Sequence, residues 1–103
     1  MADTVPTVTV TIGRNIRDFP MPENWWETFK SDVSAALDRD GVDVWVDTDY
    51  FGSWDDVTEE AHVWHGEDKH PADDQMLKDQ LQVLKDKYEQ DAIGLAFGKG
   101  QLV

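Results

Sequence analysis

The chain has 103 residues, no cysteine and a formal net charge of −13 at pH 7, while 40% of its residues are hydrophobic and five are tryptophan. This length and apolar content indicate one folded domain and argue against intrinsic disorder, and the lack of cysteine excludes disulfides, thiolate nucleophiles and cysteine-based metal sites. The excess of acids repels phosphate, so we expect no direct nucleic-acid binding and no binding to anionic membranes.

The first predicted elements are a strand and a helix. Residues 7–12 alternate threonine with valine or isoleucine, which predicts a half-buried strand that ends at Gly13. A loop then leads to a helix that starts near Pro22 and stops before Gly41. Its expected buried stripe, at helical spacing, is Trp26, Phe29, Val33, Ala36 and Leu37.

The next segment, "VDVWVDTDYFGSWDDVTEEAHVW" at 42–64, holds seven acids and three tryptophans without a lysine or arginine. We interpret it as a β-hairpin with Gly52–Ser53 as the two-residue turn. That register places Val42 opposite Val63 and makes one face apolar. It also places Val44 opposite Ala61, Asp43 opposite His62, and Trp45 opposite Glu60, so the other face is acidic and aromatic.

A second helix and a last strand complete the chain. Leucines at helical spacing after Pro71 predict the helix, and the alternation of Ile93, Leu95 and Phe97 predicts a short strand. The order β-α-β-β-α-β predicts a single α+β domain over 1–103 with the ferredoxin-like split βαβ plan, an antiparallel four-stranded sheet with both helices on one face. The expected open face carries Thr7, Thr9, Thr11, Asp43, Trp45, Asp47, Glu60, His62 and Trp64.

A calcium loop is the first metal site to consider. Residues 47–58 place aspartate at positions one, three and nine and glycine at position six, as an EF-hand does. However, position five is Phe51, position twelve is Thr58, and the flanking segments are predicted strands rather than helices. We therefore interpret the segment as a hairpin end with solvated acids. Weak, non-specific divalent binding stays open for Asp47, Asp49, Asp55 and Asp56.

The three histidines do not form a convincing metal site either. In a strand, His62 and His65 point to opposite faces, and His70 follows in a loop. We interpret them as surface histidines. The sequence thus predicts neither a metal ion nor a cofactor.

The sequence contains none of the catalytic motifs that we considered. None of the three serines lies in a G-x-S-x-G elbow, and the glycines form neither a P-loop nor a dinucleotide fingerprint. The enzymatic alternative is a small hydrolase in which Asp43 and His62 pair across the hairpin, with no evident nucleophile beside them. We therefore expect a protein that is not an enzyme.

The segment "VTVTIGRNIRDFPMPENWWETFKSDVSAAL", residues 8–37, resembles the N-terminal part of small uncharacterised proteins encoded by bacteriophages of actinobacteria. In those proteins a "TIGRN" strand end also leads through a Pro/Met loop into a helix with the pattern W..F..DV. The resemblance implies a phage gene product that acts in the host cytoplasm. Many such phage proteins bind and inhibit a host or defence protein, some by imitating the charge of DNA. The resemblance carries over no functional residue.

Together these observations predict a small acidic protein-binding module whose partner has a basic surface. The expected anchors are Trp45, Trp54 and Trp64, and the acids expected to steer the partner are Asp43, Asp47, Asp49, Asp55, Asp56 and Glu60. A homodimer that uses the same open face is the main alternative. Because the chain has neither an apolar run of membrane-spanning length nor the pattern of a secretory leader, we expect a cytoplasmic protein.

Overall fold

The computed structural model describes residues 3–54 and 57–102. The strands of its main sheet are β1 (Asp3–Gly13), β4 (Val42–Trp54), β5 (Val57–Asp68) and β6 (Gly94–Leu102). The two helices are α1 (Glu23–Arg39) and α2 (Asp74–Lys87), and a 3-10 turn, η1 (Pro71–Asp73), precedes α2. Two-residue strands, β2 (Asn15–Ile16) and β3 (Phe19–Pro20), form a small separate hairpin in the loop before α1.

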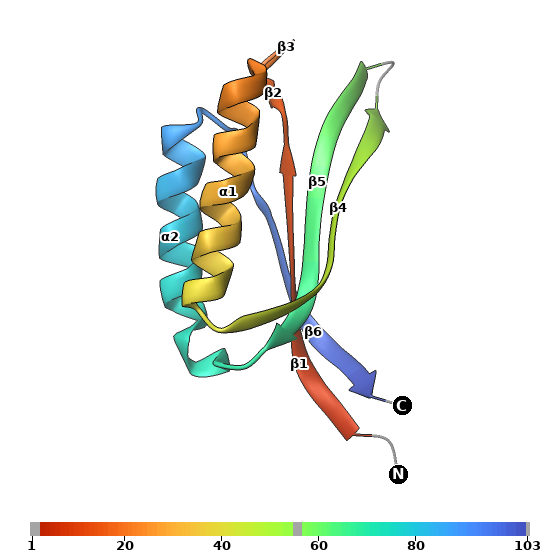
Figure 1. The fold of residues 1–103 in the computed structure, drawn as a ribbon, viewed down its shortest axis with the longest axis vertical. Helices are drawn as coiled ribbons and strands as arrows, with labels where there is room; N and C mark the ends of the chain where they lie inside the picture. The colour runs from red at the N-terminus through yellow and green to blue at the C-terminus, as the bar shows by residue number, and fades with distance from the viewer. Residues whose placement is uncertain (1–2, 55–56, 103) are drawn as a thin grey trace.

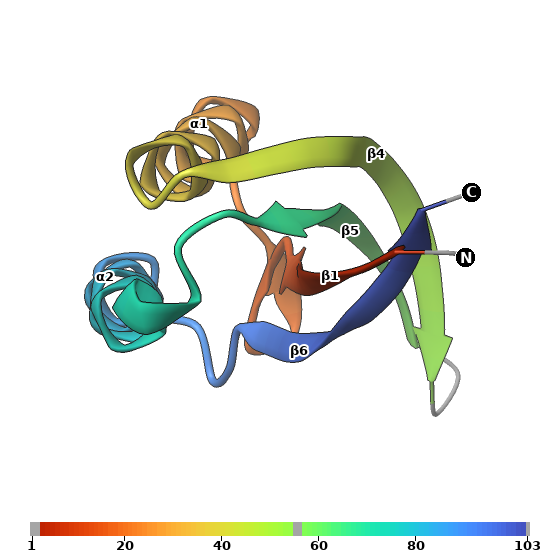
Figure 2. The ribbon, with the colours of Figure 1, turned by 90° about the horizontal axis from the view of Figure 1, so that it is seen from below.

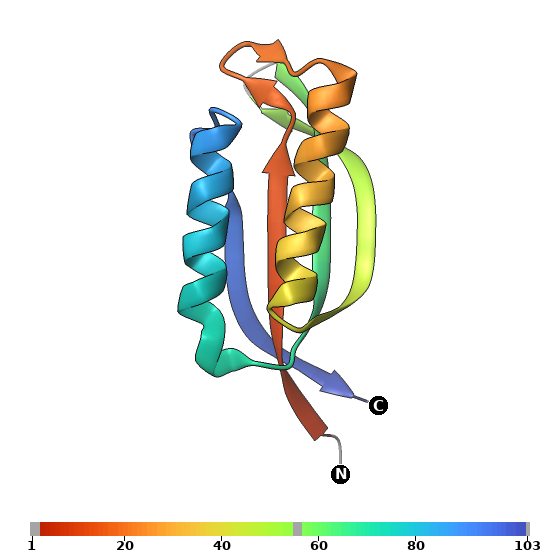
Figure 3. The ribbon, with the colours of Figure 1, turned by 60° about the vertical axis from the view of Figure 1, so that its left-hand side comes forward.

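The sheet has the order β4-β5-β1-β6, and each neighbouring pair is antiparallel. Both helices cover one face of this sheet (Figure 1), and they run side by side in opposite directions (Figure 3). This arrangement confirms the predicted ferredoxin-like plan. Among the described residues, neither helix has the length and apolar character needed to cross a membrane.

The core lies between the helices and the central strands. Val8, Val10 and Ile12 of β1 point toward the helices and are buried, as their alternation predicts. The predicted stripe of α1 is buried in full, and Phe29 from this stripe stacks on Tyr88 with ring centroids 4.5 Å apart. Burying each large apolar side chain contributes roughly 1.5–3 kcal/mol, so this layer holds the helices on the sheet.

The predicted hairpin register is wrong. Gly52 and Ser53 do not form the turn but pair within the ladder, β4 continues to Trp54, and β5 begins at Val57. Val42 lies opposite Asp68 rather than Val63. Since the displacement at this end of the hairpin is five residues, an odd number, the side chains from Glu60 to Trp64 lie on the faces of the sheet opposite to the predicted ones.

A β-bulge at Trp45 changes the outer strand as well. Val44 packs on the core and Trp45 lies on the open face, as predicted, but the register of β4 against β5 shifts between Val44 and Val46. Asp47, which was predicted on the open face, therefore lies opposite Trp64 and contacts His62 on the helix-covered face. The Trp45 ring lies 5.8 Å from the His65 ring and close to Gly100 of β6. Bulges increase twist, and the sheet is strongly curled, with β4 and β6 bending toward the same side away from the helices (Figure 2). The curl brings Trp45 within reach of β6, across the open face.

Candidate functional site

The outermost strand, β4, carries the most exposed part of the acidic segment. It is an edge strand that pairs with β5 on one side, and from Asp43 to Phe51 every residue except Val44 is exposed. We call residues 43–51 the β4 edge. An edge strand presents a row of backbone N–H and C=O groups on its outer side, and these groups are available to another chain.

Both acids and aromatic rings are exposed along the β4 edge. Trp45 is 44% exposed and Phe51 is 73% exposed. Tyr50, which directly precedes Phe51, is exposed as well. Of the predicted binding residues, the edge brings together Trp45, Asp43, Asp47 and Asp49. Sequence reasoning missed Tyr50 and Phe51, which it treated as part of the approach to a turn. The signal that could have found them is the pair of strand-forming aromatic residues directly before Gly52.

Two of the predicted binding residues are not available at this surface. Trp64 is only 2% exposed and lies opposite Val10 of β1, on the face covered by the helices, so it belongs to the core. Glu60 accepts a 2.7 Å hydrogen bond from Arg14 in an ion pair. The prediction that these two residues share the open face is wrong, because the register of β5 reverses its faces. The side chain of Trp54, together with Asp55 and Asp56, lies outside the described part of the structure.

The acids of the β4 edge do have basic partners, which the sequence did not reveal. The two ring nitrogens of His62 contact the carboxylates of Asp47 and Asp49. Lys30 of α1 lies 3.4 Å from Asp49 and 3.0 Å from Glu27. We call His62, Asp47, Asp49 and Lys30 the His62 clamp. It fastens the middle of β4 to β5 and to α1.

The electrostatics of the clamp favour ionised carboxylates. The hydrogen bond from His62 holds the pKa of Asp49 below its ordinary value, with a further contribution from the charge of Lys30, and together they outweigh the opposing effect of burial. The His62 ring lies over Trp64, with centroids 4.3 Å apart. A hollow of about 280 Å³ opens beside the clamp and is lined by α1 residues and Asp47.

The position of His62 also separates it from Asp43, the other member of the predicted hydrolase pair. Asp43 lies opposite Glu67 on the open face, whereas His62 lies on the helix-covered face and contacts Asp47 and Asp49 instead. His65, which the sequence placed among the surface histidines, is half-buried on the open face, where its Nδ1 forms a 2.7 Å hydrogen bond with Thr9 Oγ1. Asp43 and His62 therefore do not act on one another.

A larger hollow, of about 570 Å³, lies at the end of β1 that carries Gly13. It is formed where the β2–β3 loop and the loop between α2 and β6 approach the start of β5. Hydrogen bonds tie these loops together, from Asn15 N to Glu59 Oε1 at 2.8 Å and from Gln90 Nε2 to Asn15 O at 3.2 Å. Charged groups of both signs line it: Arg17, Asp18, Glu59 and Asp91.

Comparison with known proteins identifies the fold rather than a family. No protein-family model matches this chain, and no curated protein sequence matches it. A solved structure described as a phage SAM lyase in the apo state superposes with a TM-score of 0.65 and covers 93% of this chain and 81% of that chain. The two sequences are 16% identical over this match, so the likeness concerns the backbone architecture.

Proposed function

We propose that this chain is a phage-encoded protein that binds a protein with a basic surface through its β4 edge. The observation that carries the proposal is the exposed edge strand itself, which presents the acids Asp43, Asp47 and Asp49 together with the rings of Trp45 and Phe51. The phage origin rests on the resemblance of residues 8–37 and is supported by the fold that the chain shares with a phage protein.

Three physical properties of the edge suit a protein partner. Its outer backbone groups can accept a further strand, which supplies hydrogen bonds without demanding a particular sequence. Exposed tryptophan and phenylalanine provide large anchors for desolvated pockets. A net charge of −13 attracts a basic partner and accelerates its approach.

The class of partner follows from the same charge. A surface that repels nucleic acid is complementary to a protein that binds nucleic acid, because both phosphates and carboxylates satisfy clustered arginine and lysine. We therefore infer a host or defence protein whose basic surface normally faces DNA or RNA. Occupation of that surface by the β4 edge would inhibit it.

The proposal is tested by affinity capture from a host lysate with matched variants. Asp43→Asn/Asp47→Asn removes two charges from the edge, and Trp45→Ser/Phe51→Ser removes two anchors. Asp79→Asn/Asp86→Asn removes the same number of charges from the exposed side of α2. There Asp79 accepts a hydrogen bond from Gln75, and Asp86 accepts one from Gln82 and lies 3.8 Å from Lys85. This pair is the control for charge alone.

We expect both edge variants to reduce capture of one basic protein by about 10-fold or more, since a lost anchor or steering charge costs 1–2 kcal/mol or more. The α2 control should retain it. Capture should also weaken as sodium chloride rises from about 50 to 300 mM, because salt screens exposed charges. Equal capture by the wild type and both edge variants would overturn the assigned surface.

Self-association through the same edge is the alternative to a foreign partner. Two copies would bring Asp43, Asp47 and Asp49 of each chain together, which disfavours pairing at low salt. Light scattering at low and high protein concentration separates the cases. A monomer at both concentrations supports a foreign partner, and a dimer that Trp45→Ser/Phe51→Ser dissociates would replace it.

An enzyme that acts on S-adenosylmethionine, as the name of the structural neighbour states for that protein, is the second candidate. The observation that favours it is the hollow of about 570 Å³, which lies within the usual range of ligand pockets, roughly 300–1,000 Å³. Its lining offers Arg17 for a carboxylate and Glu59 and Asp91 for the ammonium and sulfonium charges. Calorimetry with S-adenosylmethionine, repeated with Glu59→Gln and followed by mass spectrometry of the ligand, tests this candidate. Absence of heat with the wild type would remove it.

A further inference from the structure

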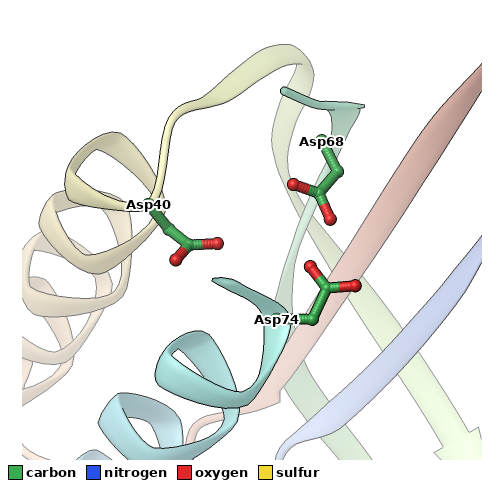
Figure 4. A group of neighbouring side chains, drawn as sticks. All are labelled: Asp40, Asp68 and Asp74. Atoms are coloured by element: carbon green, nitrogen blue, oxygen red, sulfur yellow. The ribbon is translucent and has the colours of Figure 1, made fainter. Parts of the chain in front are cut away.

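Three aspartates from separate segments converge at the end of the molecule where α1 meets α2. Asp40 follows the last residue of α1, Asp68 is the last residue of β5, and Asp74 is the first residue of α2. Their carboxylates point toward one another (Figure 4), and one oxygen from each lies within 4.8 Å of the other two. We call these residues the aspartate cluster.

The local backbone builds this cluster. Gly41 adopts a positive φ of 76°, which ends α1 and turns the chain into β4, and its carbonyl accepts a 3.3 Å hydrogen bond from Lys69 N. The backbone N–H of His70 donates a 3.1 Å hydrogen bond to Oδ1 of Asp68. A side chain at position 41 would collide with the His70 ring, so the two connections pack tightly and leave the carboxylates fixed.

The cluster is buried and lacks a neutralising partner. Asp68 is 1% exposed and Asp40 is 5% exposed, and the Oδ2 atom of each has no hydrogen-bond partner among the described residues. Oδ1 of Asp74 is also buried without a hydrogen-bond partner among the described residues. Burial of an unpaired anion is costly, and leaving its lone pairs unsatisfied adds to that cost. The three side chains therefore leave carboxylate oxygens that still need a hydrogen-bond donor or a positive charge.

The neighbouring charged side chains do not neutralise the aspartate cluster. Burial, followed by the hydrogen bond and repulsion from Asp68, raises the pKa of Asp74 to about 6. Burial and the charge of Asp68 raise the pKa of Asp40, which His70 only partly offsets. Lys78 acts on Asp74 from one turn along α2. Negative charge thus exceeds positive charge around the cluster.

We infer that the aspartate cluster is a binding site for a hard divalent cation, Ca²⁺ or Mg²⁺. Carboxylate oxygens are the ligands that both ions prefer, at about 2.3–2.6 Å for calcium and 2.0–2.1 Å for magnesium. Two oxygens bound to one such ion can be at most about 4–5 Å apart. One oxygen from each of the three aspartates lies within 4.8 Å of the other two, so the three are close enough to share an ion. With no nitrogen or sulfur ligand in the cluster, softer metals have no advantage.

The cation would join three elements at one end of the helical layer. It would tie the end of α1 to the end of β5 and the start of α2, and Asp68 is also the partner of Val42, where β4 begins. The site is distinct from the β4 edge and from the His62 clamp. It does not depend on the proposed partner, because its effect is on the stability of the fold.

The test is thermal unfolding of the full chain near pH 7 in calcium, in magnesium and in a chelator, with calorimetry to count bound ions. An ion that binds only the folded state at about 100 times its dissociation constant raises the unfolding midpoint by on the order of 10 °C. We expect one ion per chain. The ion that gives the larger shift identifies the preferred cation.

Matched variants locate the effect. Asp74→Asn removes a ligand that is only half-buried, so the chain should still fold, and Asp38→Asn removes the same charge from the exposed end of α1. In chelator, Asp74→Asn should unfold at a higher temperature than the wild type because repulsion is relieved. In calcium or magnesium the order should reverse, while Asp38→Asn should follow the wild type in both.

Two results would overturn the inference. One is an unfolding midpoint of the wild type that neither ion changes, which would mean that the cluster is satisfied by a shared proton instead. The other is an equal shift in the wild type and in Asp74→Asn, which would place the bound ion at other acids.

Discussion

The His62 clamp and the aspartate cluster are built from the same residue type and differ in every electrostatic respect. In the clamp, Asp47 and Asp49 are half-exposed and contact His62, with Lys30 beside Asp49. In the cluster, Asp40 and Asp68 are buried and face other carboxylates. The first arrangement is complete within the chain, whereas the second needs a proton or a cation from solution.

This difference shows how an acidic chain divides its roles. Acids at the surface cost little, since water and a few basic side chains stabilise them, and they remain free to attract a partner. Acids in the interior are maintained only where something offsets their desolvation. The pKa directions agree with this division, because the pKa of Asp49 is lowered and that of Asp40 is raised.

The largest expected effect concerns Trp64, the core residue on which the His62 ring lies. Trp64→Ala should lower the free energy of unfolding by about 3–5 kcal/mol, because it leaves a cavity beneath His62 in the core. Trp45→Ala should cost about 1 kcal/mol or less, since that ring is nearly half-exposed. Urea unfolding followed by circular dichroism measures both. Equal losses would mean that β5 does not present Trp64 to the helices.

The sequence predicted the parts of this comparison that depend on periodicity. The alternation in 7–12 identified β1, and the helical spacing from Trp26 to Leu37 identified the buried stripe of α1. These two patterns, with the element order, were enough for the ferredoxin-like plan. Each is a local pattern that tertiary contacts reinforce.

The register of β4 and β5 was not predictable in the same way. Gly52–Ser53 is an acceptable turn by its own chemistry, and only the need to bury Trp64 against Val10 selects the longer hairpin. The bulge at Trp45 has no signal in a single sequence. The aspartate cluster was missed because its members lie far apart in a chain with 22 acids, so that no spacing distinguishes them.

The second prediction reverses the sign of a stability change between the two regions. In chelator, Asp68→Asn/Asp74→Asn should raise the free energy of unfolding by about 1–2 kcal/mol, because it removes two like charges that face one another, one of them buried and the other half-buried. Asp47→Asn/Asp49→Asn should lower it by about 1 kcal/mol, because His62 loses both of its carboxylate partners and Lys30 loses one of two. Both variants lose two charges, so net charge is the same. Changes of equal sign would contradict the distinction between paired and unpaired acids.

The smallest expected effect concerns pH and the clamp alone. The pKa of Asp49 is lowered in the folded protein, so the folded state binds the proton less readily than the unfolded state. The resulting stabilisation is complete above the ordinary aspartate pKa of about 3.9 and is lost as the pH falls through the lower folded value. Because the carboxylate is half-exposed, we expect less than about 1 kcal/mol.

The measurement is the difference in unfolding free energy between the wild type and Asp49→Asn across the acid range. This difference should be largest near pH 7 and should shrink toward about pH 3, where the wild-type carboxyl becomes protonated and loses its ion pair with Lys30 and its role as acceptor for His62. Lys30→Met, which removes one of the two partners, should retain part of the dependence through His62. A difference that stays constant down to about pH 3 would mean that the clamp does not lower the pKa of Asp49 in the folded state.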